Sequence, residues 1–369
     1  MKVLVIAPSK AYGGGEAYIN NLVDKLHKNN VEVILFCASS ILMKKVEGKV
    51  SRIILVPDFT SLGLSTITSI FKINQILKRD KIDAVFLNGL PEIGVYSRFI
   101  SSNKIICIGH SNEEWLKEAW NKNLKRALKN IITFKFENHI TKFIAINNIA
   151  MENVSHRENL FKNTEVIYNG VPEIKWSLND ETYSKNEIVF GRISRLCPGK
   201  GNEYLLSAFQ RLCKKYNEQK FKLLIAGEGE EKNKLKKIVI DLGLKGKVDF
   251  LGHIAPLDFF KNIDCMVSPS DMEATPLVIL EAMSCRIPIL ATNVGGVPEL
   301  ISHNVSGFLY ESKSVSSCFN ALEDYVLDIN KYTTLSEHAY NEYLSKFTIE
   351  KCFNKTYSLI CEVGERRNV

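Results

Sequence analysis

Short apolar runs alternate with amphipathic helical patterns along most of this chain, and the alternation limits the folds available to it. The pattern starts at residue 2 and resumes at residue 188, after a polar stretch that ends at Glu187. Strands that alternate with helices are typical of open parallel sheets covered by helices. The sequence therefore predicts an α/β fold with two such sheets. The expected strands are Lys2–Ala7, Val31–Phe36, Arg52–Val56, Ala84–Leu87, Ile105–Ile108, Lys142–Ile146, Ile188–Phe190, Phe221–Ala226, Val248–Gly252, Cys265–Val267, Ile287–Thr292 and Gly307–Tyr310.

Length and composition agree with two domains. The chain has 369 residues, 45% of them hydrophobic, which is enough for two cores of ordinary size. Its nine cysteines are scattered singly, so we expect reduced thiols rather than a metal site or a disulfide framework. The chain opens on a strand, and no apolar run approaches the roughly 18 residues that span a bilayer. We expect a cytoplasmic protein, with the inner face of the cytoplasmic membrane as an open alternative.

The charge of the chain is mildly basic, with a formal net charge of +7 at pH 7. No block of Lys and Arg is dense enough for a nucleic-acid arm, so no nucleic-acid partner is expected. The excess suits an anionic substrate or a membrane surface, and a solvated basic face remains equally open. The segment Asn112–His139 is rich in Lys and Trp. It reads either as an interfacial helix that contacts a membrane or as an ordinary surface helix.

The stretch Ser268–Met283 carries two carboxylates, Glu273 and Glu281, eight positions apart. It follows an expected strand and leads into a helical pattern. Thr275 is a good N-cap, and Pro276 suits the first helical position because its φ is fixed and it lacks an N–H. We therefore expect one carboxylate in the strand-to-helix loop and the other within the helix.

The start of this helix is a candidate phosphate site. The amides of Leu277 and Val278 would be unpaired donors at the positive end of the helix dipole. They are therefore able to hold a phosphate between the two carboxylates. This arrangement suits a sugar nucleotide, which has hydroxyls at both ends and a diphosphate between them.

Three other strand ends carry candidate ligand groups. Arg195 and Lys200 flank the loop after residues 188–190, where fixed cations would neutralise a diphosphate, although exposed loop charges would look the same. The glycines at 13–15 follow the first strand and either admit a ligand close to the backbone or form a tight turn. They do not form the G-x-G-x-x-G pattern of dinucleotide binders. His110 follows another strand directly, at the edge where open α/β sheets bind ligands.

Four motifs in succession resemble those of retaining GT-B glycosyltransferases of the family 4 type. The match covers nearly the whole chain in the right order. The motifs are Gly13-Gly14-Gly15-Glu16, Asn169-Gly170-Val171, Arg195-Leu-Cys-Pro-Gly-Lys200-Gly201, and Ser270-x-x-Glu273 with Glu281-Ala-Met, Pro288 and Gly295-Gly296-Val-Pro-Glu299.

The resemblance implies two Rossmann-like domains that face each other across a cleft. The first would comprise residues 1–168, joined by a C-terminal helix at about 347–369, and would lie on the acceptor side. The second would comprise residues 169–346 and bind the donor.

The resemblance also implies roles for individual residues. Arg195 and Lys200 would bind the donor diphosphate, with Arg192 as a rival for the arginine, because only Arg195 keeps the family's spacing to the lysine. Glu281 would bind the ribose, while Glu273 and His110 would contact the transferred sugar. The expected catalytic residues are thus Arg195, Lys200, Glu273 and His110. The expected donor-binding residues are Gly14, Gly15, Ala274, Thr275, Pro276, Leu277, Val278, Glu281, His253 and Ile254.

The implied reaction is metal-independent transfer, with retention, from a nucleotide diphosphate sugar, expected to be a UDP-sugar. No cofactor is expected, and the chain has no Asp-x-Asp cluster suited to Mg²⁺. The acceptor would be a hydroxyl of a glycan or a lipid-linked glycan, as in polysaccharide or lipopolysaccharide synthesis. Peripheral contact with a membrane would suit such an acceptor. A sugar-nucleotide epimerase and a non-catalytic sugar-nucleotide binding subunit are the alternatives.

The chain departs from the family pattern at two positions. Ala274 stands where the family usually has Gly, which adds a methyl group beside the expected sugar pocket. Arg286 stands where Gly often ends the helix, and a left-handed conformation there would cost roughly 1 kcal/mol.

Overall fold

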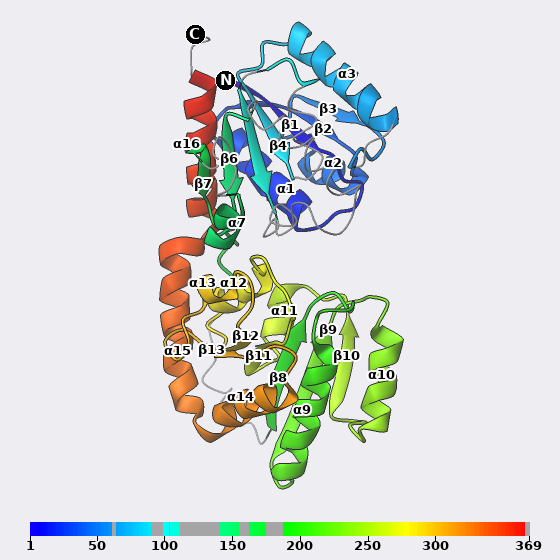
Figure 1. Cartoon of the computed structure of the whole chain (residues 1–369), viewed down its shortest axis with the longest axis vertical. Coiled ribbons are helices and arrows are strands. Elements are labelled where there is room, and N and C mark those ends of the chain that lie inside the picture. The colour runs from blue at the N-terminus through cyan, green and yellow to red at the C-terminus, as the bar shows by residue number, and fades with distance from the viewer. Residues whose placement is uncertain are drawn as a thin grey trace. The chain divides into compact units, whose positions relative to one another are not determined.

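The computed structural model divides into two compact units (Figure 1). Unit 1 comprises Met1–Tyr168 and Glu350–Val369, and unit 2 comprises Asn169–Ile349. The second boundary lies three residues later than the sequence predicts. The structure describes residues 1–60, 64–89, 99–102, 104–110, 140–154, 162–174 and 187–365. The basic and aromatic segment Asn112–His139 lies outside the described residues.

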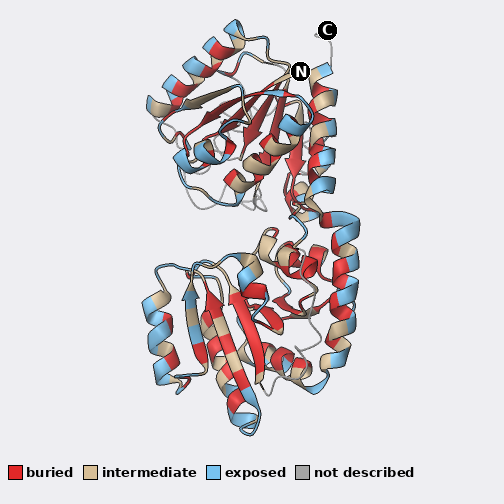
Figure 2. Cartoon of the chain, turned by 180° about the vertical axis from the view of Figure 1, so that it is seen from behind, coloured by how far each residue is buried: buried red, intermediate tan, exposed pale blue. Residues whose placement is uncertain are grey.

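Unit 1 is built on a parallel sheet whose order is β3-β2-β1-β4-β5-β6-β7. Its central strands are apolar runs buried on both faces, as a parallel sheet covered by helices requires, whereas the edge strands β3 and β7 are only partly buried (Figure 2). The strands are β1 (Lys2–Ala7), β2 (Glu32–Cys37), β3 (Arg52–Leu55), β4 (Ala84–Asn88), β5 (Ile105–Gly109), β6 (Lys142–Ala145) and β7 (Thr164–Val166). The helices are α1 (Gly14–Lys28), α2 (Ser40–Val46), α3 (Leu64–Arg79), α7 (Asn148–Asn153) and α16 (Ile349–Glu365).

Strand β7 is the one strand of this sheet that the sequence analysis missed. Its three residues pair in parallel with β6, with Thr164 opposite Phe143. A segment of three residues with a central glutamate has no apolar run to signal it. No strand was therefore predicted between Ile146 and Ile188.

Unit 2 has a second parallel sheet, with the order β10-β9-β8-β11-β12-β13. The strands are β8 (Glu187–Ile193), β9 (Lys220–Ala226), β10 (Val248–Gly252), β11 (Cys265–Ser268), β12 (Ile289–Thr292) and β13 (Phe308–Tyr310). The helices are α9 (Asn202–Lys215), α10 (Lys232–Asp241), α11 (Pro256–Phe260), α12 (Leu277–Ser284), α13 (Val297–Leu300), α14 (Val315–Leu327), α15 (Ile329–Glu342) and the π-helix η3 (Tyr343–Phe347). The prediction of two parallel α/β sheets is confirmed.

Both sheets have the strand order 3-2-1-4-5-6 of the Rossmann fold within them. The order reverses between β1 and β4 in unit 1, and between β8 and β11 in unit 2. Open α/β sheets bind ligands beyond the carboxyl ends of their strands at this switch point. The two places to search are therefore the loops after β1 and β4, and the loops after β8 and β11.

The C-terminal helix α16 packs on unit 1. The hydroxyl groups of Thr356 and Tyr18 lie 2.8 Å apart, and Lys104 Nζ donates to the carbonyl of Gly364 at 2.8 Å. Within unit 2, the backbone of Val171 pairs with Phe347 and with Ile349, the first residue of α16. The amide of Val171 donates to the carbonyl of Phe347 at 3.1 Å, and the amide of Ile349 donates to the carbonyl of Val171 at 2.9 Å.

Arg286 adopts the left-handed conformation, with φ of 55°. Its guanidinium group lies 3.5 Å from the ring centroid of Tyr340, and its Nε lies 3.1 Å from a carboxylate oxygen of Glu337. These contacts with α15 offset part of the backbone cost. These contacts explain how an arginine can follow the end of α12, at a position where glycine would adopt the left-handed conformation without the backbone cost.

Candidate functional site

The loops after β8 and β11 meet through an ion pair. Lys200 Nζ lies 2.7 Å from Glu273 Oε1, and both side chains are mostly buried. The backbones of the two loops are also joined, because the amide of Asp271 donates to the carbonyl of Gly199 at 2.9 Å. The structure thus brings together two of the four predicted catalytic residues, at the switch point of unit 2.

Gly201 shows why this junction requires glycine. Its φ is +69°, and a Cβ there would lie 1.8 Å from the carbonyl oxygen of Pro269. Any side chain would therefore push the two loops apart. On the other side of the site, the amide of Gly296 donates to the carbonyl of Glu273 at 3.2 Å. The loop that carries Lys200 and the turn that carries Gly296 therefore both contact Glu273 directly.

Arg192 lies beneath this junction and is only 1% exposed. Its terminal nitrogens donate to Ser270 Oγ at 2.9 Å, to Ser268 Oγ at 3.2 Å and to the carbonyl of Lys200 at 3.2 Å. Burial lowers the pKa of Arg192, and the nearby charge of Glu273 opposes that shift. The guanidinium group therefore stays charged at neutral pH.

Thr292 completes the polar layer under the site. Its hydroxyl lies within bonding distance of the carbonyls of Ser270, at 2.6 Å, and Ser268, at 3.3 Å. The two serines and this threonine had no predicted role. The available signal was an arginine within a mainly apolar strand, together with a Ser-x-Ser pattern that begins at the last residue of β11.

Arg195 lies in the same loop as Lys200 but is exposed. Arg192, its rival from the sequence, is committed to three neutral oxygens beneath the loop. Of the two arginines, Arg195 is therefore the one whose guanidinium group is open to solvent, and its role remains a prediction.

Helix α12 begins one residue later than predicted. Pro276, with φ of −70° and ψ of 109°, is the N-cap, and Leu277 is the first helical residue. The prediction that Thr275 is the N-cap is therefore wrong. The fixed φ of proline is compatible with the extended N-cap conformation as well as with the first helical turn. Leu277 and Val278 remain in the first turn, where amides lack intrahelical acceptors.

Glu281 lies within α12, as predicted, and is partly buried. Burial raises its pKa to about 7. A carboxyl group of this kind changes its protonation near neutral pH and passes from hydrogen-bond donor to acceptor as it does so.

Two predicted donor residues lie farther along the sheet. His253 and Ile254 follow β10, and His253 is exposed. Strand β9 separates β10 from β8, whose loop holds Lys200. These two residues share the carboxyl edge of the sheet with the Lys200 and Glu273 pair but follow a strand two positions away.

The corresponding cluster in unit 1 forms around His110. Its Nε2 lies 2.6 Å from Asn88 Oδ1, the side chain that ends β4. A Cβ on Gly15 would lie 3.2 Å from the His110 ring, whereas one on Gly14 would meet nothing within 4 Å. Gly15 is therefore needed for packing against the histidine, and the surface over Gly14 is open.

His110 is held as a neutral imidazole. Burial lowers its pKa to about 4, and the ring of Tyr18 lies edge-on with its centroid 5.4 Å away. With Asn88 Oδ1 as acceptor, Nε2 carries the proton and Nδ1 is left as an acceptor. The cluster thus presents a neutral group able to accept a hydrogen bond.

Across the described ranges, no group of three or more His, Cys, Asp or Glu side chains is placed to hold a metal ion. In the same part of the chain, no helix is both long and apolar enough to cross a bilayer.

Two parallel sheets in Rossmann order, each with polar groups at its switch point, define a two-unit fold of the GT-B class. Two family models match the chain in succession, Glycosyltransferase Family 4 over residues 12–173 and Glycosyl transferases group 1 over residues 176–342. Together the two models cover most of the chain, and the chain belongs to the glycosyltransferases that they describe.

Individual relatives agree with this assignment. The chain is similar to an uncharacterized glycosyltransferase of Haemophilus influenzae, with 30% identity over 48% of this chain and 50% of the relative. The alignments span about half of the length of the curated relatives that match first. Two solved structures share the fold. Anabaena Alr3699/HepE in complex with UDP has a TM-score of 0.81 and 21% identity, over 98% of this chain and 100% of that chain. The lipopolysaccharide outer core galactosyltransferase WaaB has a TM-score of 0.75 and 18% identity, over 98% and 99%.

Proposed function

We propose that the protein transfers a sugar from a UDP-sugar to a hydroxyl group of an acceptor, with retention at the anomeric carbon and without a metal ion. The observation that carries this proposal is the Lys200 and Glu273 pair, 2.7 Å apart at the switch point of unit 2 and close in sequence to the first turn of α12. Cations, a carboxylate and unpaired amides are the groups that a sugar diphosphate requires. The UDP bound to the similar Anabaena protein supports the choice of nucleotide.

The residue roles follow from this chemistry. Arg195, Lys200 and the amides that begin α12 bind the diphosphate. Glu281 accepts hydrogen bonds from the ribose hydroxyls, and Glu273 accepts one from the transferred sugar. The contact with the transferred sugar that the family resemblance implies for His110 stays a prediction.

The reaction forms a bond between the acceptor oxygen and the anomeric carbon and breaks the bond from that carbon to the phosphate oxygen. The acceptor proton passes to the departing phosphate, on the same face of the sugar. Negative charge grows on the phosphate as it leaves, and fixed cations stabilise that charge in the transition state. Glu273 is held by Lys200, which suits a hydroxyl-binding group better than a nucleophile.

For the acceptor we propose a glycan or a lipid-linked glycan at the inner face of the cytoplasmic membrane. The support is the similarity to a lipopolysaccharide galactosyltransferase and the basic charge of the chain. An intermediate of polysaccharide or lipopolysaccharide synthesis would be an acceptor of this kind.

The donor proposal is tested by thermal shift with UDP, ADP, GDP and UDP-sugars. A ligand that binds only the folded state stabilises it by RT ln(1 + [L]/Kd), about 2.7 kcal/mol at a hundredfold excess over Kd. We expect UDP and one UDP-sugar to raise Tm, and ADP and GDP to leave it unchanged. Incubation of that UDP-sugar without acceptor then separates the alternatives, because an epimerase would convert it to another UDP-sugar. Binding without transfer to any acceptor would indicate a non-catalytic subunit.

The raised pKa of Glu281 gives a pH dependence for UDP binding. Ribose hydroxyls donate to the ionised carboxylate, so binding favours its deprotonated form. We therefore expect the Kd for UDP to fall as pH rises through about 7, with a proton released on binding below that pH. Calorimetry in two buffers of different ionisation enthalpy measures the proton. In the Glu281→Gln variant the release should be smaller than in the wild type, and an equal release in that variant would contradict the role.

A further inference from the structure

Helix α3 of unit 1 is apolar on two opposite faces. Its buried face carries Ile73 and Ile76, together with the buried hydroxyl groups of Thr66 and Ser69. Its outer face nevertheless carries large apolar side chains. These are Leu64, Ile67 and Phe71, which are 83%, 65% and 64% exposed. At 100° per residue these three fall within an arc of about 60°, on the side of the helix away from the sheet.

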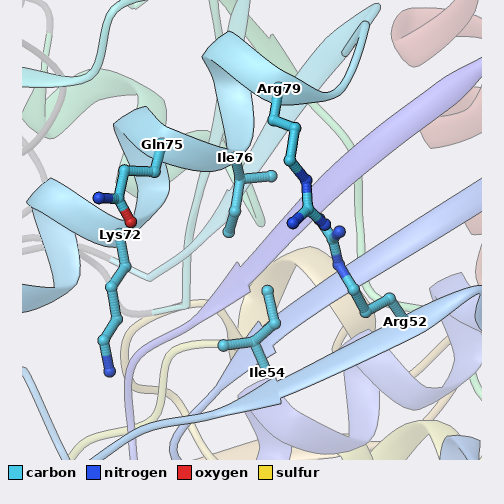
Figure 3. A pocket seen from close by; sticks show the side chains of 6 residues that line it. All are labelled: Arg52, Ile54, Lys72, Gln75, Ile76 and Arg79. Carbon is cyan, nitrogen blue, oxygen red and sulfur yellow. The ribbon is translucent and has the colours of Figure 1, made fainter.

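A cationic pocket lies beside this outer face, between α3 and the edge strand β3 (Figure 3). Its volume is about 380 Å³. The figure shows Lys72 extending into the hollow from α3, with Arg52 and Arg79 side by side at one end. The lining residues are Arg52, Ile54, Lys72, Gln75, Ile76 and Arg79.

Positive charge predominates on this surface. Helix α3 contains Lys72, Lys78 and Arg79 and no Asp or Glu. The neighbouring Asp80 pairs with Arg52 at 2.7 Å, and Arg79 lies 3.7 Å from the same oxygen. One carboxylate thus offsets one of the three cations around the pocket.

Helix α10 of unit 2 gives an internal comparison. It is also basic, with Lys232, Lys234, Lys236 and Lys237, but Ile240 is its one large exposed apolar residue, at 68% exposure. Basic charge alone is therefore common to both helices. The combination of an exposed apolar stripe with a cationic pocket belongs to α3.

We propose that the outer face of α3 docks on a bilayer of anionic phospholipid, with the pocket taking a headgroup phosphate. Apolar side chains flanked by Lys and Arg, without acidic residues, are the pattern of a helix that lies in a membrane interface. The cationic surface is complementary in charge to anionic lipid, because each Lys or Arg near an anionic membrane favours binding. The proposal deepens the membrane part of the proposed function and does not depend on sugar transfer.

Sedimentation with vesicles tests the proposal on the whole protein. We expect binding at low salt to phosphatidylcholine vesicles that contain phosphatidylglycerol, and little binding to phosphatidylcholine alone. The double variant Lys72→Gln/Arg79→Gln should lower the partition coefficient about 30-fold, from roughly fivefold for each cation removed. The variant Ile67→Ser/Phe71→Ser should lower it at least about tenfold.

Matched variants on α10 are the control. Ile240→Ser and Lys236→Gln/Lys237→Gln remove the same kinds of group from an equally exposed helix and should leave vesicle binding within about twofold. The melting-temperature shift produced by UDP should be the same in all variants, so a failure of lipid binding is distinct from a failure of donor binding.

Three results would overturn the proposal. The wild-type protein could fail to sediment with anionic vesicles at low salt, or the α10 variants could lose as much binding as the α3 variants. Alternatively, sedimentation velocity without lipid could show self-association that Phe71→Ser abolishes, which would make this face an interface between copies of the chain.

Discussion

Replacing Lys200 or Arg195 by alanine is expected to lower kcat by about 10² to 10³ while changing the Kd for the UDP-sugar donor far less. The reason is that the charge on the diphosphate increases as the sugar bond breaks, so a fixed cation gains most in the transition state. Steady-state kinetics with a UDP-sugar, combined with calorimetric binding of the same UDP-sugar in the absence of acceptor, measures both quantities. Lys214→Ala, an exposed lysine on α9, is the control and should leave both unchanged.

The Lys200→Ala variant requires a second experiment, because removing the lysine also removes its 2.7 Å ion pair with Glu273. A cycle with Glu273→Gln and the double variant separates the two effects. If Lys200 acts on the phosphate, its removal should still lower kcat at least about tenfold in the Glu273→Gln background. If kcat then stays unchanged, Lys200 serves only to hold the carboxylate, and the assigned role is wrong.

The fold was predictable from the sequence because a parallel sheet buries both faces of its strands. Such strands are continuous apolar runs, and β1 and β10 were predicted with their observed bounds. The edge strand β7 was missed because its side chains carry no such run. The start of α12 was predicted one residue too early, since both Thr275 and Pro276 are compatible with the N-cap position.

Residues of the candidate site were predictable where they lay in recognised motifs, but the contacts between them were not. Lys200 and Glu273 were each singled out, yet their ion pair depends on the meeting of two loops 73 positions apart. The partner of His110 is Asn88, 22 positions earlier, and nothing in the local sequence of either residue indicates the other. Sheet topology makes these contacts, and it follows from strand order rather than from local pattern.

The two arginines of the β8 loop should respond in opposite ways to the same substitution, and this is the second large effect that we expect. Arg192→Leu should lower the free energy of unfolding by about 3 kcal/mol, because two buried serine hydroxyls and the carbonyl of Lys200 lose their donor. Arg195→Leu should change that free energy by no more than about 0.5 kcal/mol, because the side chain is exposed, yet it should abolish most of the turnover. Urea unfolding followed by circular dichroism gives the stability of both variants.

A leucine is able to fill part of the space that the arginine leaves, and replacing a buried charge by an apolar group is sometimes neutral. Arg192→Lys resolves this point, since it keeps the charge but cannot reach three acceptors in a fixed planar geometry. We expect the lysine variant to be destabilised as well, and to show a lower kcat with little change in KM, because the carbonyl that positions Lys200 is no longer held. If both Arg192 variants keep the wild-type stability and kcat while Arg195→Leu unfolds more easily, the buried arginine is not the support of the loop. The assignment of the two arginines would then have to be exchanged.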